Sequence, residues 1–324
     1  MRCSPLNRAL DAIKYWSNIL TENIMIKRML LASAPERQEE LNNLWDEYAP
    51  EFNLREDKDG FSLSVIFGTV VFDHKSLCQM WLLGFAAQKA FQAYSPLIIL
   101  SNWMNAPIST KSLPDDTEQT KQLNEFSEII DNILELKSLT DINDFSWPKN
   151  IPHPDQGKPT DVNGAMVFDL ICMSGAYCFL HEIQHIRFGI DGTDLDVHQE
   201  ELACDKFARD MLLKKVNEYS ASSGYDEKIV CTKRAMSIAL ASFLLFAITP
   251  KTSWGTTDTH PRIKDRIDEL TNSIGIDDND NFWIYFASLA MSIAYYNEVL
   301  INPMVATNMK NYTLSIIDAL DSSI

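Results

Sequence analysis

The chain has 324 residues, 46% of them hydrophobic, which is enough for one large domain or two ordinary domains with a substantial core. Its 45 acidic residues outnumber 28 basic ones, and a formal net charge of -17 would repel phosphate groups, so a role in binding DNA or RNA is disfavoured. The six cysteines form no CxxC pair, a pattern that suits free thiols in a reducing compartment such as the cytoplasm.

The first fifty residues show helical spacing of apolar residues and predict two helices that end at the Ala49-Pro50 break. Their opening stretch, MRCSPLNRALDAIKYW, lacks the uninterrupted apolar core and the cleavage site of a secretory signal. A DKDG turn signal at 57–60 then separates a short strand from FSLSVIFGTVVF at 61–72. This second run is rich in β-branched and aromatic residues, so it predicts a strand.

Helical periodicity returns after this strand and continues towards the C-terminus. It predicts helices at 76–94, 116–136, 165–188, 200–219, 228–248, 261–272, 282–301 and 311–320. Many helices with one small β segment predict a mainly α fold with a small β-sheet, in the α+β class.

The segment 138–163 interrupts the helical pattern with prolines at 148, 152, 154 and 159. It predicts either a loop that shapes a substrate groove or a linker that crosses the surface. Since no repeat or break in composition divides the chain, we expect a single domain over 1–324. Its parts are a helical and β-hairpin part at 1–137, this connection, and a helical core at 164–324 that holds the metal site described next.

Two apolar runs, 235–248 and 282–296, are shorter than the roughly 20 residues that a membrane-spanning helix needs. We therefore expect them to form buried core helices and expect no stable membrane span. Peripheral membrane association remains as the minor option.

The stretch CFLHEIQHIRFG places two histidines four residues apart around a glutamate. On a helix, residues i and i+4 lie one turn apart on the same face, so His181 and His185 can direct two imidazoles at one point. Glu182 lies about 100° round the helix, where it can reach a water molecule at the metal without binding the metal itself. This HExxH pattern predicts a zinc site.

A catalytic zinc ion needs a third protein ligand and an open position for water. The downstream stretch EELACDKFARDML supplies Glu201 as that ligand, and Asp205, one turn later, can accept a hydrogen bond from a ligating imidazole. The alternative is that HEIQH is an exposed helical turn and Glu201 a surface acid. His198 is close to Glu201 in sequence, but a histidine in a polar loop is expected to be solvated.

These motifs resemble those of a known group of peptidases. HEIQH, the Glu201 to Asp205 segment and DTHPRIKDRI at 258–267 are similar to the HExxH, ExxxD and THP signatures of gluzincin peptidases of the HtpX type. With Ser-Trp-Pro-Lys at 146–149, the four segments in order resemble more closely the Lit family of bacterial phage-exclusion proteases. The family has Glu-Ala where this chain has Ala203-Cys204.

The resemblance implies a zincin-like core and an intracellular zinc endopeptidase that acts in phage exclusion, a form of abortive infection and antiviral defence. It implies translation elongation factor Tu as a substrate and a phage-derived peptide as an activator. Within this reading Glu182 is the general base. His260, expected at a helix N-cap before Pro261, donates to the oxyanion with Arg266 behind it. The alternatives are a cap without chemistry for His260 and a salt bridge for Arg266.

Two other functions stay open on the sequence. One is a sensing or binding protein whose zinc is structural, although no cysteine lies at ligand spacing from either histidine in the sequence. The other is a quality-control peptidase of the HtpX type, which the short apolar runs disfavour. The strand at 61–72 is expected either to receive an extended substrate at its edge or to be ordinarily buried.

Overall fold

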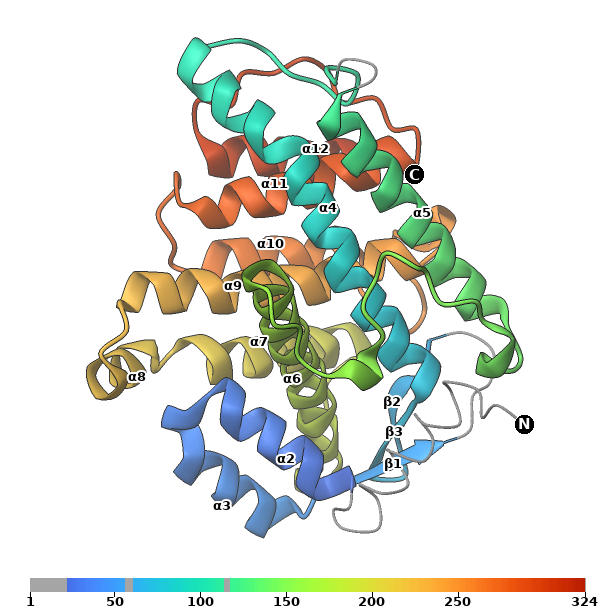
Figure 1. The fold of residues 1–324 in the computed structure, drawn as a ribbon. Coiled ribbons are helices and arrows are strands. Elements are labelled where there is room, and N and C mark those ends of the chain that lie inside the picture. Colours follow the sequence, from blue (N-terminus) through green and yellow to red (C-terminus); the bar gives the residue numbers. More distant parts are fainter. Residues whose placement is uncertain (1–21, 56–60, 114–116, 324) are drawn as a thin grey trace.

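Helices make up most of the chain in the computed structural model, which describes residues 22–55, 61–113 and 117–323 (Figure 1). The helices are α2 (Glu22–Ser33), α3 (Gln38–Tyr48), α4 (His74–Met104), α5 (Glu118–Ser138), α6 (Val162–Asp191), α7 (Val197–Leu213), α8 (Val216–Ser223), α9 (Glu227–Ile248), α10 (Ile263–Ser273), α11 (Asn281–Tyr296) and α12 (Met309–Asp321). One small sheet contains β1 (Glu51–Arg55), β2 (Leu63–Ile66) and β3 (Thr69–Asp73). The predicted fold class, mainly α with a small β-sheet, is confirmed.

The predicted strand at 61–72 is two strands, so the expectation of one continuous strand was wrong. Phe67 and Gly68 both have positive φ, 50° and 79°, and form the tight turn that joins β2 to β3. Such a two-residue turn matches the natural twist of a hairpin. β1 pairs with β3 in parallel, giving the order β1-β3-β2 and leaving β2 at the edge. The DKDG turn at 57–60 lies outside the described residues.

Most predicted helices are present, with three larger changes at their ends. The helix predicted at 76–94 continues through Pro96 to Met104 in α4. The helix predicted at 200–219 breaks at Lys214-Lys215 into α7 and α8. The helix predicted at 282–301 ends at Tyr296, because Glu298 adopts a positive φ of 55° that cannot continue a helix. Two helices, α2 and α3, lie within the first fifty residues, and the predicted helical positions before residue 22 lie outside the described residues.

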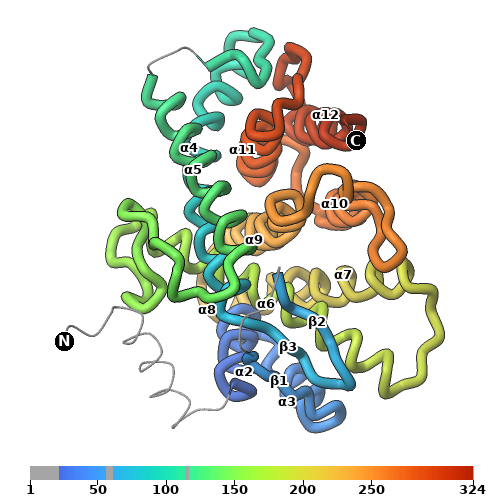
Figure 2. The backbone as a smooth tube through the Cα atoms, turned by 90° about the vertical axis from the view of Figure 1, so that its right-hand side faces the viewer, coloured from blue at the N-terminus to red at the C-terminus, as the bar shows by residue number. Residues whose placement is uncertain are grey.

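Helix α6 lies at the centre and carries the HExxH sequence. Asp161 caps its first turn by accepting from the Gly164 N–H at 2.8 Å, and Gly192 ends it in the left-handed conformation. The sheet packs on α6 through Phe179, whose ring meets Phe52 of β1 and Phe72 of β3 edge to face. Figure 2 shows β2 and β3 in front of α6, with α7, α9 and α10 above them in this view. The HExxH turn of α6 is therefore surrounded by the sheet and by α7, α9 and α10.

The connection between α5 and α6 is packed against the protein. It contains two short 3-10 turns, and Phe145 and Ile151 are buried. The Trp81 side chain donates to the Pro152 carbonyl at 2.8 Å. The connection lines an apolar cavity of about 280 Å³ together with α4 and α6. The division of the chain into 1–137, 138–163 and 164–324 stays a prediction.

Two helices, α6 and α9, are long and apolar enough to cross a membrane by length and composition. The length of the apolar run at 235–248 is therefore shorter than that of the helix that contains it, because α9 begins at Glu227. In the most apolar 18 residues of each helix, 50% of the residues of α6 and 56% of those of α9 are buried inside the protein. That the chain has no stable membrane span stays a prediction.

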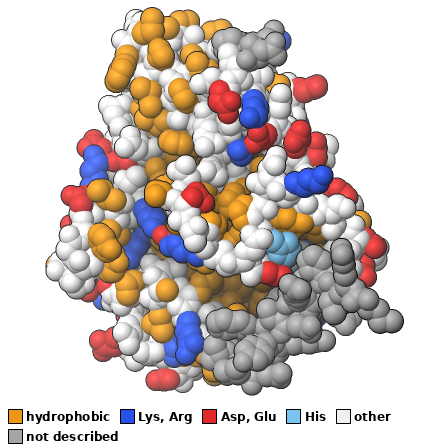
Figure 3. Space-filling model, in the orientation of Figure 1, with side chains coloured by type: hydrophobic (Ala, Val, Ile, Leu, Met, Phe, Trp, Pro, Cys, Tyr) orange, Lys and Arg blue, Asp and Glu red, His pale blue; other side chains and the backbone are white. Residues whose placement is uncertain are grey.

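The molecular face in Figure 3 carries acidic and basic side chains interspersed among hydrophobic ones. On this face the excess of acid is therefore not gathered in one patch. Hydrophobic side chains gather at the top left, where α4 ends with the exposed residues Leu100, Trp103 and Met104.

Candidate active site

The HExxH turn of α6 faces the interior. His181 is 7% exposed and Glu182 is 8% exposed. The two imidazole rings of His181 and His185 lie with their centroids 4.9 Å apart and their Nε2 atoms 3.2 Å apart. An exposed helical turn would not bury these side chains, so that alternative reading is excluded.

Helix α7 brings Glu201 to the two imidazoles. A five-residue turn at 192–196 reverses the chain, and Asp196 caps α7 by accepting from the N–H groups of His198 and Gln199. The Glu201 carboxylate then lies 3.5 Å from His181 Nε2 and 3.3 Å from His185 Nε2. Two nitrogens and a carboxylate from distant segments thus form a compact triangle.

The donor triangle fits a tetrahedral metal ion. Zinc bonds of about 2.0–2.2 Å in tetrahedral geometry place neighbouring ligand atoms about 3.3–3.6 Å apart. The two Nε2 atoms lie 3.2 Å apart, His185 Nε2 lies 3.3 Å from Glu201 Oε1, and His181 Nε2 lies 3.5 Å from Glu201 Oε2, so each separation is close to this spacing. Nitrogen and carboxylate oxygen are also the donor types of catalytic zinc sites. The residues present therefore fit the metal that the motif implies.

Each imidazole is held from behind by a carboxylate. His181 Nδ1 lies 2.9 Å from Asp205 Oδ1, and His185 Nδ1 lies 2.7 Å from Glu200 Oε1. A carboxylate accepts from the Nδ1–H, and this leaves the lone pair of each Nε2 directed at the triangle. The expected contact of Asp205 is present, whereas Glu200 was missed.

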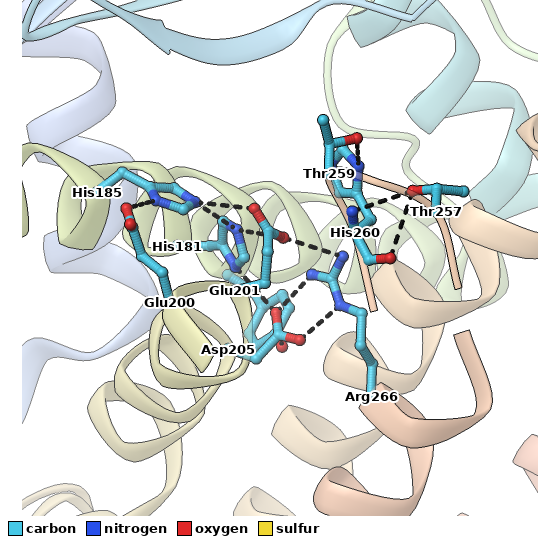
Figure 4. Close-up of polar contacts among 10 residues, drawn as sticks. His181, His185, Glu200, Glu201, Asp205, Thr257, Thr259, His260 and Arg266 are labelled. Atoms are coloured by element: carbon cyan, nitrogen blue, oxygen red, sulfur yellow. Dashed lines mark hydrogen bonds and ion pairs between the residues drawn. The ribbon is translucent and has the colours of Figure 1, made fainter. Parts of the chain in front are cut away.

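Asp205 joins three helices at the site (Figure 4). Besides His181, its carboxylate accepts from the Tyr177 hydroxyl at 3.0 Å and from Arg266 Nε and Nη2 at 2.6 and 2.7 Å. Arg266 Nη1 also lies 3.5 Å from the Glu201 carboxylate. Since its guanidinium is directed at these two acids, the geometry supports a positioning role for Arg266. Its predicted role behind the oxyanion donor stays a prediction.

Cys204 adds a thiol behind the triangle. Its ligand atom and one ligand atom of each imidazole lie within 4.8 Å of one another. The three residues His181, His185 and Cys204 could therefore also hold a metal ion. The spacing argument from the sequence overlooked this thiol, because the contact is made between helices. Glu201 is the better third donor, since its oxygens lie 3.3 and 3.5 Å from the imidazole nitrogens and it lines the open cavity, whereas the Cys204 side chain is fully buried.

A loop before α10 brings His260 to the same cavity. Its ring Nδ1 lies 2.8 Å from the Thr259 hydroxyl, and its N–H donates to the Thr257 hydroxyl. The expected N-cap position was wrong, because α10 begins at Ile263 with Arg262 as its N-cap residue and no side chain caps it. His198 Nε2 donates to the Thr257 carbonyl at 2.8 Å and so ties this loop to α7.

The triangle opens into a cavity of about 990 Å³. Glu182 and His260 line it, and so do five consecutive residues at 61–65, the last three of which belong to β2. Because successive side chains of a strand point to opposite faces, a cavity lined by consecutive residues runs along the edge of the strand. The lining of this cavity does not include the connection at 138–163, which lines the apolar cavity beside α4 instead. That this loop shapes a substrate groove stays a prediction.

The side chains of the site form one charged cluster: His181, Glu182, His185, Glu200, Glu201, Asp205 and Arg266. The charges in this cluster shift one another's pKa values. Burial alone would lower the pKa of both histidines, but hydrogen bonds to carboxylates outweigh it and raise each pKa from 6.5 to about 9. Burial would raise the pKa of Glu201 and Asp205, but the histidines and Arg266 hold both well below their usual range. Burial raises the pKa of Glu182, against the opposing charges of the histidines.

These shifts predict opposite pH trends for the metal-free and metal-loaded protein. The raised histidine pKa values stabilise the metal-free fold below pH 6.5, and this contribution is lost as the pH rises through about 9. The lowered carboxylate pKa values stabilise it above about pH 4.5. Metal binding requires deprotonated imidazoles, so its stabilisation grows with pH.

We therefore expect the Tm difference between zinc-loaded and chelator-treated protein to increase from pH 6.5 to pH 9, as measured by calorimetry. His185→Gln, which removes one donor, is expected to abolish most of this difference. A difference that stays constant across this range would contradict the assignment of the histidines.

The chain matches the model of one protein family. The family model described as Peptidase U49 matches residues 70–286, from β3 to α11, which is more than half of the chain and includes every residue of the cluster. Comparison with curated proteins and with solved structures gave no match.

Proposed function

The chain belongs to the Peptidase U49 family, which makes it a peptidase by family, and on this premise we propose that it is a zinc-dependent endopeptidase with a zincin-like core. One observation carries the proposal. The triangle of His181, His185 and Glu201 has the spacing of three ligands of a tetrahedral ion and opens on a cavity that Glu182 also lines. Three protein donors with an open fourth side are typical of catalytic zinc.

In the proposed mechanism, His181, His185 and Glu201 hold the ion. Bound zinc supplies a Lewis acid that lowers the pKa of a water molecule to about 7. Glu182 takes a proton from the attacking water, whose oxygen bonds to the carbonyl carbon. The C–N bond then breaks as Glu182 returns the proton to the leaving amine. The raised pKa of Glu182 suits it to both transfers.

The surrounding residues act by position. Asp205 and Glu200 keep the imidazoles in one tautomer, and Arg266 holds Asp205. His260 lines the cavity and is the candidate donor to the developing oxyanion. The free edge of β2 supplies backbone groups that can pair with an extended substrate.

The proposed activity predicts zinc-dependent cleavage of an unstructured protein such as casein. We expect a chelator to stop the cleavage and added zinc to restore it, with fragments followed by mass spectrometry. His181→Ala is expected to be inactive at every zinc concentration that restores the wild type. Cleavage that continues in chelator at an undiminished rate would contradict the proposal.

The likeness to the Lit family supports a finer proposal, in which the chain acts in the cytoplasm in phage exclusion and cuts elongation factor Tu. The order of its four motifs, all of them within the matched residues 70–286, supports this. Incubation of purified elongation factor Tu with the protein, with and without a phage capsid peptide, is expected to give one internal cut. Intact factor beside cleaved casein would remove this substrate and leave the peptidase proposal standing.

A second candidate function follows from Cys204. If its thiol joined both histidines and Glu201 on the ion, all four positions would be closed, as in structural zinc sites. The protein would then sense or bind a partner without catalysis. The proposed endopeptidase leaves the Cys204 thiol unbound, so the ligand set of the loaded protein separates the two functions.

A further inference from the structure

The wall of the catalytic cavity beyond the cluster carries no charge among the described residues. The acidic, basic and histidine side chains that line the cavity are His181, Glu182, His185, Glu200, Glu201, Asp205, His260 and Arg266. All the other described lining residues are apolar, small or hydroxyl-bearing, including Cys178 and Tyr177. A charged substrate side chain that entered this region would meet no opposite charge.

Helix α9 forms an apolar stripe along this uncharged wall. Ala241, Leu244, Leu245 and Ile248 line the cavity, and their spacing of i, i+3, i+4 and i+7 places them on one helix face. Leu244 is 3% exposed and Ile248 is 8% exposed, whereas Leu245 is only half-buried. Leu245 is therefore the member of the stripe whose side chain is most open to a ligand.

The edge of β2 fixes how a substrate would lie beside this stripe. In a hairpin closed by a two-residue turn, Ile66 and Thr69 form the hydrogen-bonded pair, and pairing alternates along the strands. Leu63 and Val65 then direct their backbone N–H and C=O groups to the free edge. A peptide that pairs with them is extended, and its alternate side chains point to one side.

Transfer of an ionised side chain from water to an apolar wall is unfavourable without a partner, whereas an apolar side chain gains from burial. On the basis of the proposed endopeptidase function, we propose that the enzyme selects an apolar side chain beside the scissile bond, and that Leu245 determines this preference. The substrate segment is extended and uncharged at that position. A loop or an unfolded segment of a protein meets these requirements.

The experiment uses fluorogenic peptides that differ at one position next to the scissile bond, with Leu, Phe, Asp or Lys there and neutral residues elsewhere. We expect wild type to cleave the Leu and Phe peptides at least about 10-fold faster, in kcat/KM, than the Asp and Lys peptides. In Leu245→Asp, the ratio of Lys to Leu cleavage is expected to rise by at least about 10-fold, because a carboxylate then lies on the apolar stripe.

Leu134→Asp provides a matched control, since Leu134 is 37% exposed on α5 and lies outside the cavity lining. It is expected to keep the wild-type ratios. If Leu245→Asp does not fold, Leu245→Ala tests the same point, because the wider pocket is expected to shift preference from Leu towards Phe.

Equal rates for all four wild-type peptides would overturn the inference and leave the endopeptidase proposal intact. Unchanged Lys to Leu ratios in folded Leu245→Asp, or unchanged Leu to Phe ratios in Leu245→Ala, would overturn the assignment of Leu245. Failure of the wild type to cleave any peptide or casein would overturn both the endopeptidase proposal and this inference.

Discussion

Glu182→Gln is expected to lower the rate of peptide hydrolysis by about 10²- to 10⁴-fold, which is the usual contribution of a general acid or base. Glutamine has nearly the same shape but cannot take a proton from water. The metal content is expected to equal that of wild type, because Glu182 lies outside the donor triangle of His181, His185 and Glu201. Activity on casein and metal content by mass spectrometry are measured on the same samples.

Thermal stability gives an independent check on Glu182. Burial raises the pKa of this side chain, so its charged form is unfavourable in the folded state at neutral pH. A neutral glutamine should therefore leave Tm unchanged or raise it, which is common where a catalytic group is held in an unfavourable setting. Glu218→Gln, at an exposed position on α8, serves as the control and is expected to change neither activity nor Tm. Wild-type activity of Glu182→Gln would refute the proposed proton transfer.

Asp205→Ala is expected to destabilise the fold by about 3–5 kcal/mol, the usual cost of removing one partner of a buried ion pair. Its carboxylate is 3% exposed and holds His181, Tyr177 and Arg266. Without it, the Arg266 side chain, which is 13% exposed, keeps the 3.5 Å contact to Glu201 as its remaining ion pair among the described residues. Metal affinity is expected to fall by about 10- to 100-fold, because His181 loses the acceptor that orients it.

Asp210→Ala is the matched control for this change. Asp210 lies on the same helix, and its side chain pairs with Lys206 and Lys214 at the surface. Exposed pairs of this kind contribute about 0–1 kcal/mol. Denaturant unfolding of both variants compares the two sites directly. If Asp205→Ala is as stable as Asp210→Ala and binds zinc as tightly as wild type, the proposed role of Asp205 is wrong.

The sequence predicted the parts of the site that lie within one helix. The spacing of His181 and His185 requires only that 181–185 be helical, and α6 meets this condition. Asp205 lies one turn after Glu201, so one helix places both acids on the same side. Helical periodicity likewise predicted α4, α5, α6 and α9 within a few residues at most of their ends.

The missed residues depend on how helices pack against each other. Glu200 precedes the predicted ligand, and only the crossing of α7 over α6 shows that both acids reach the cluster. Tyr177 lies four residues before His181, so its place on the same face of α6 was open to prediction. Nothing in the sequence indicated that Cys204 would face the histidines, since that contact joins two helices.

Local conformation explains the other differences. Phe67 takes a positive φ that is unusual for an aromatic residue, so the run rich in β-branched and aromatic residues hid the turn between β2 and β3. The Pro261 signal suggested that a helix starts there, but the chain makes a turn closed by Thr257 and His260 first. In both places a local turn replaces the regular element that the sequence pattern predicted.

X-ray absorption at the zinc edge of the loaded protein tests the ligand assignment most directly. His181, His185 and Glu201 with a solvent position predict only nitrogen and oxygen neighbours, at about 2.0–2.2 Å, and a spectrum that does not change in Cys204→Ser. A sulfur neighbour at about 2.3 Å that disappears in Cys204→Ser would contradict the account and favour a closed, structural ion.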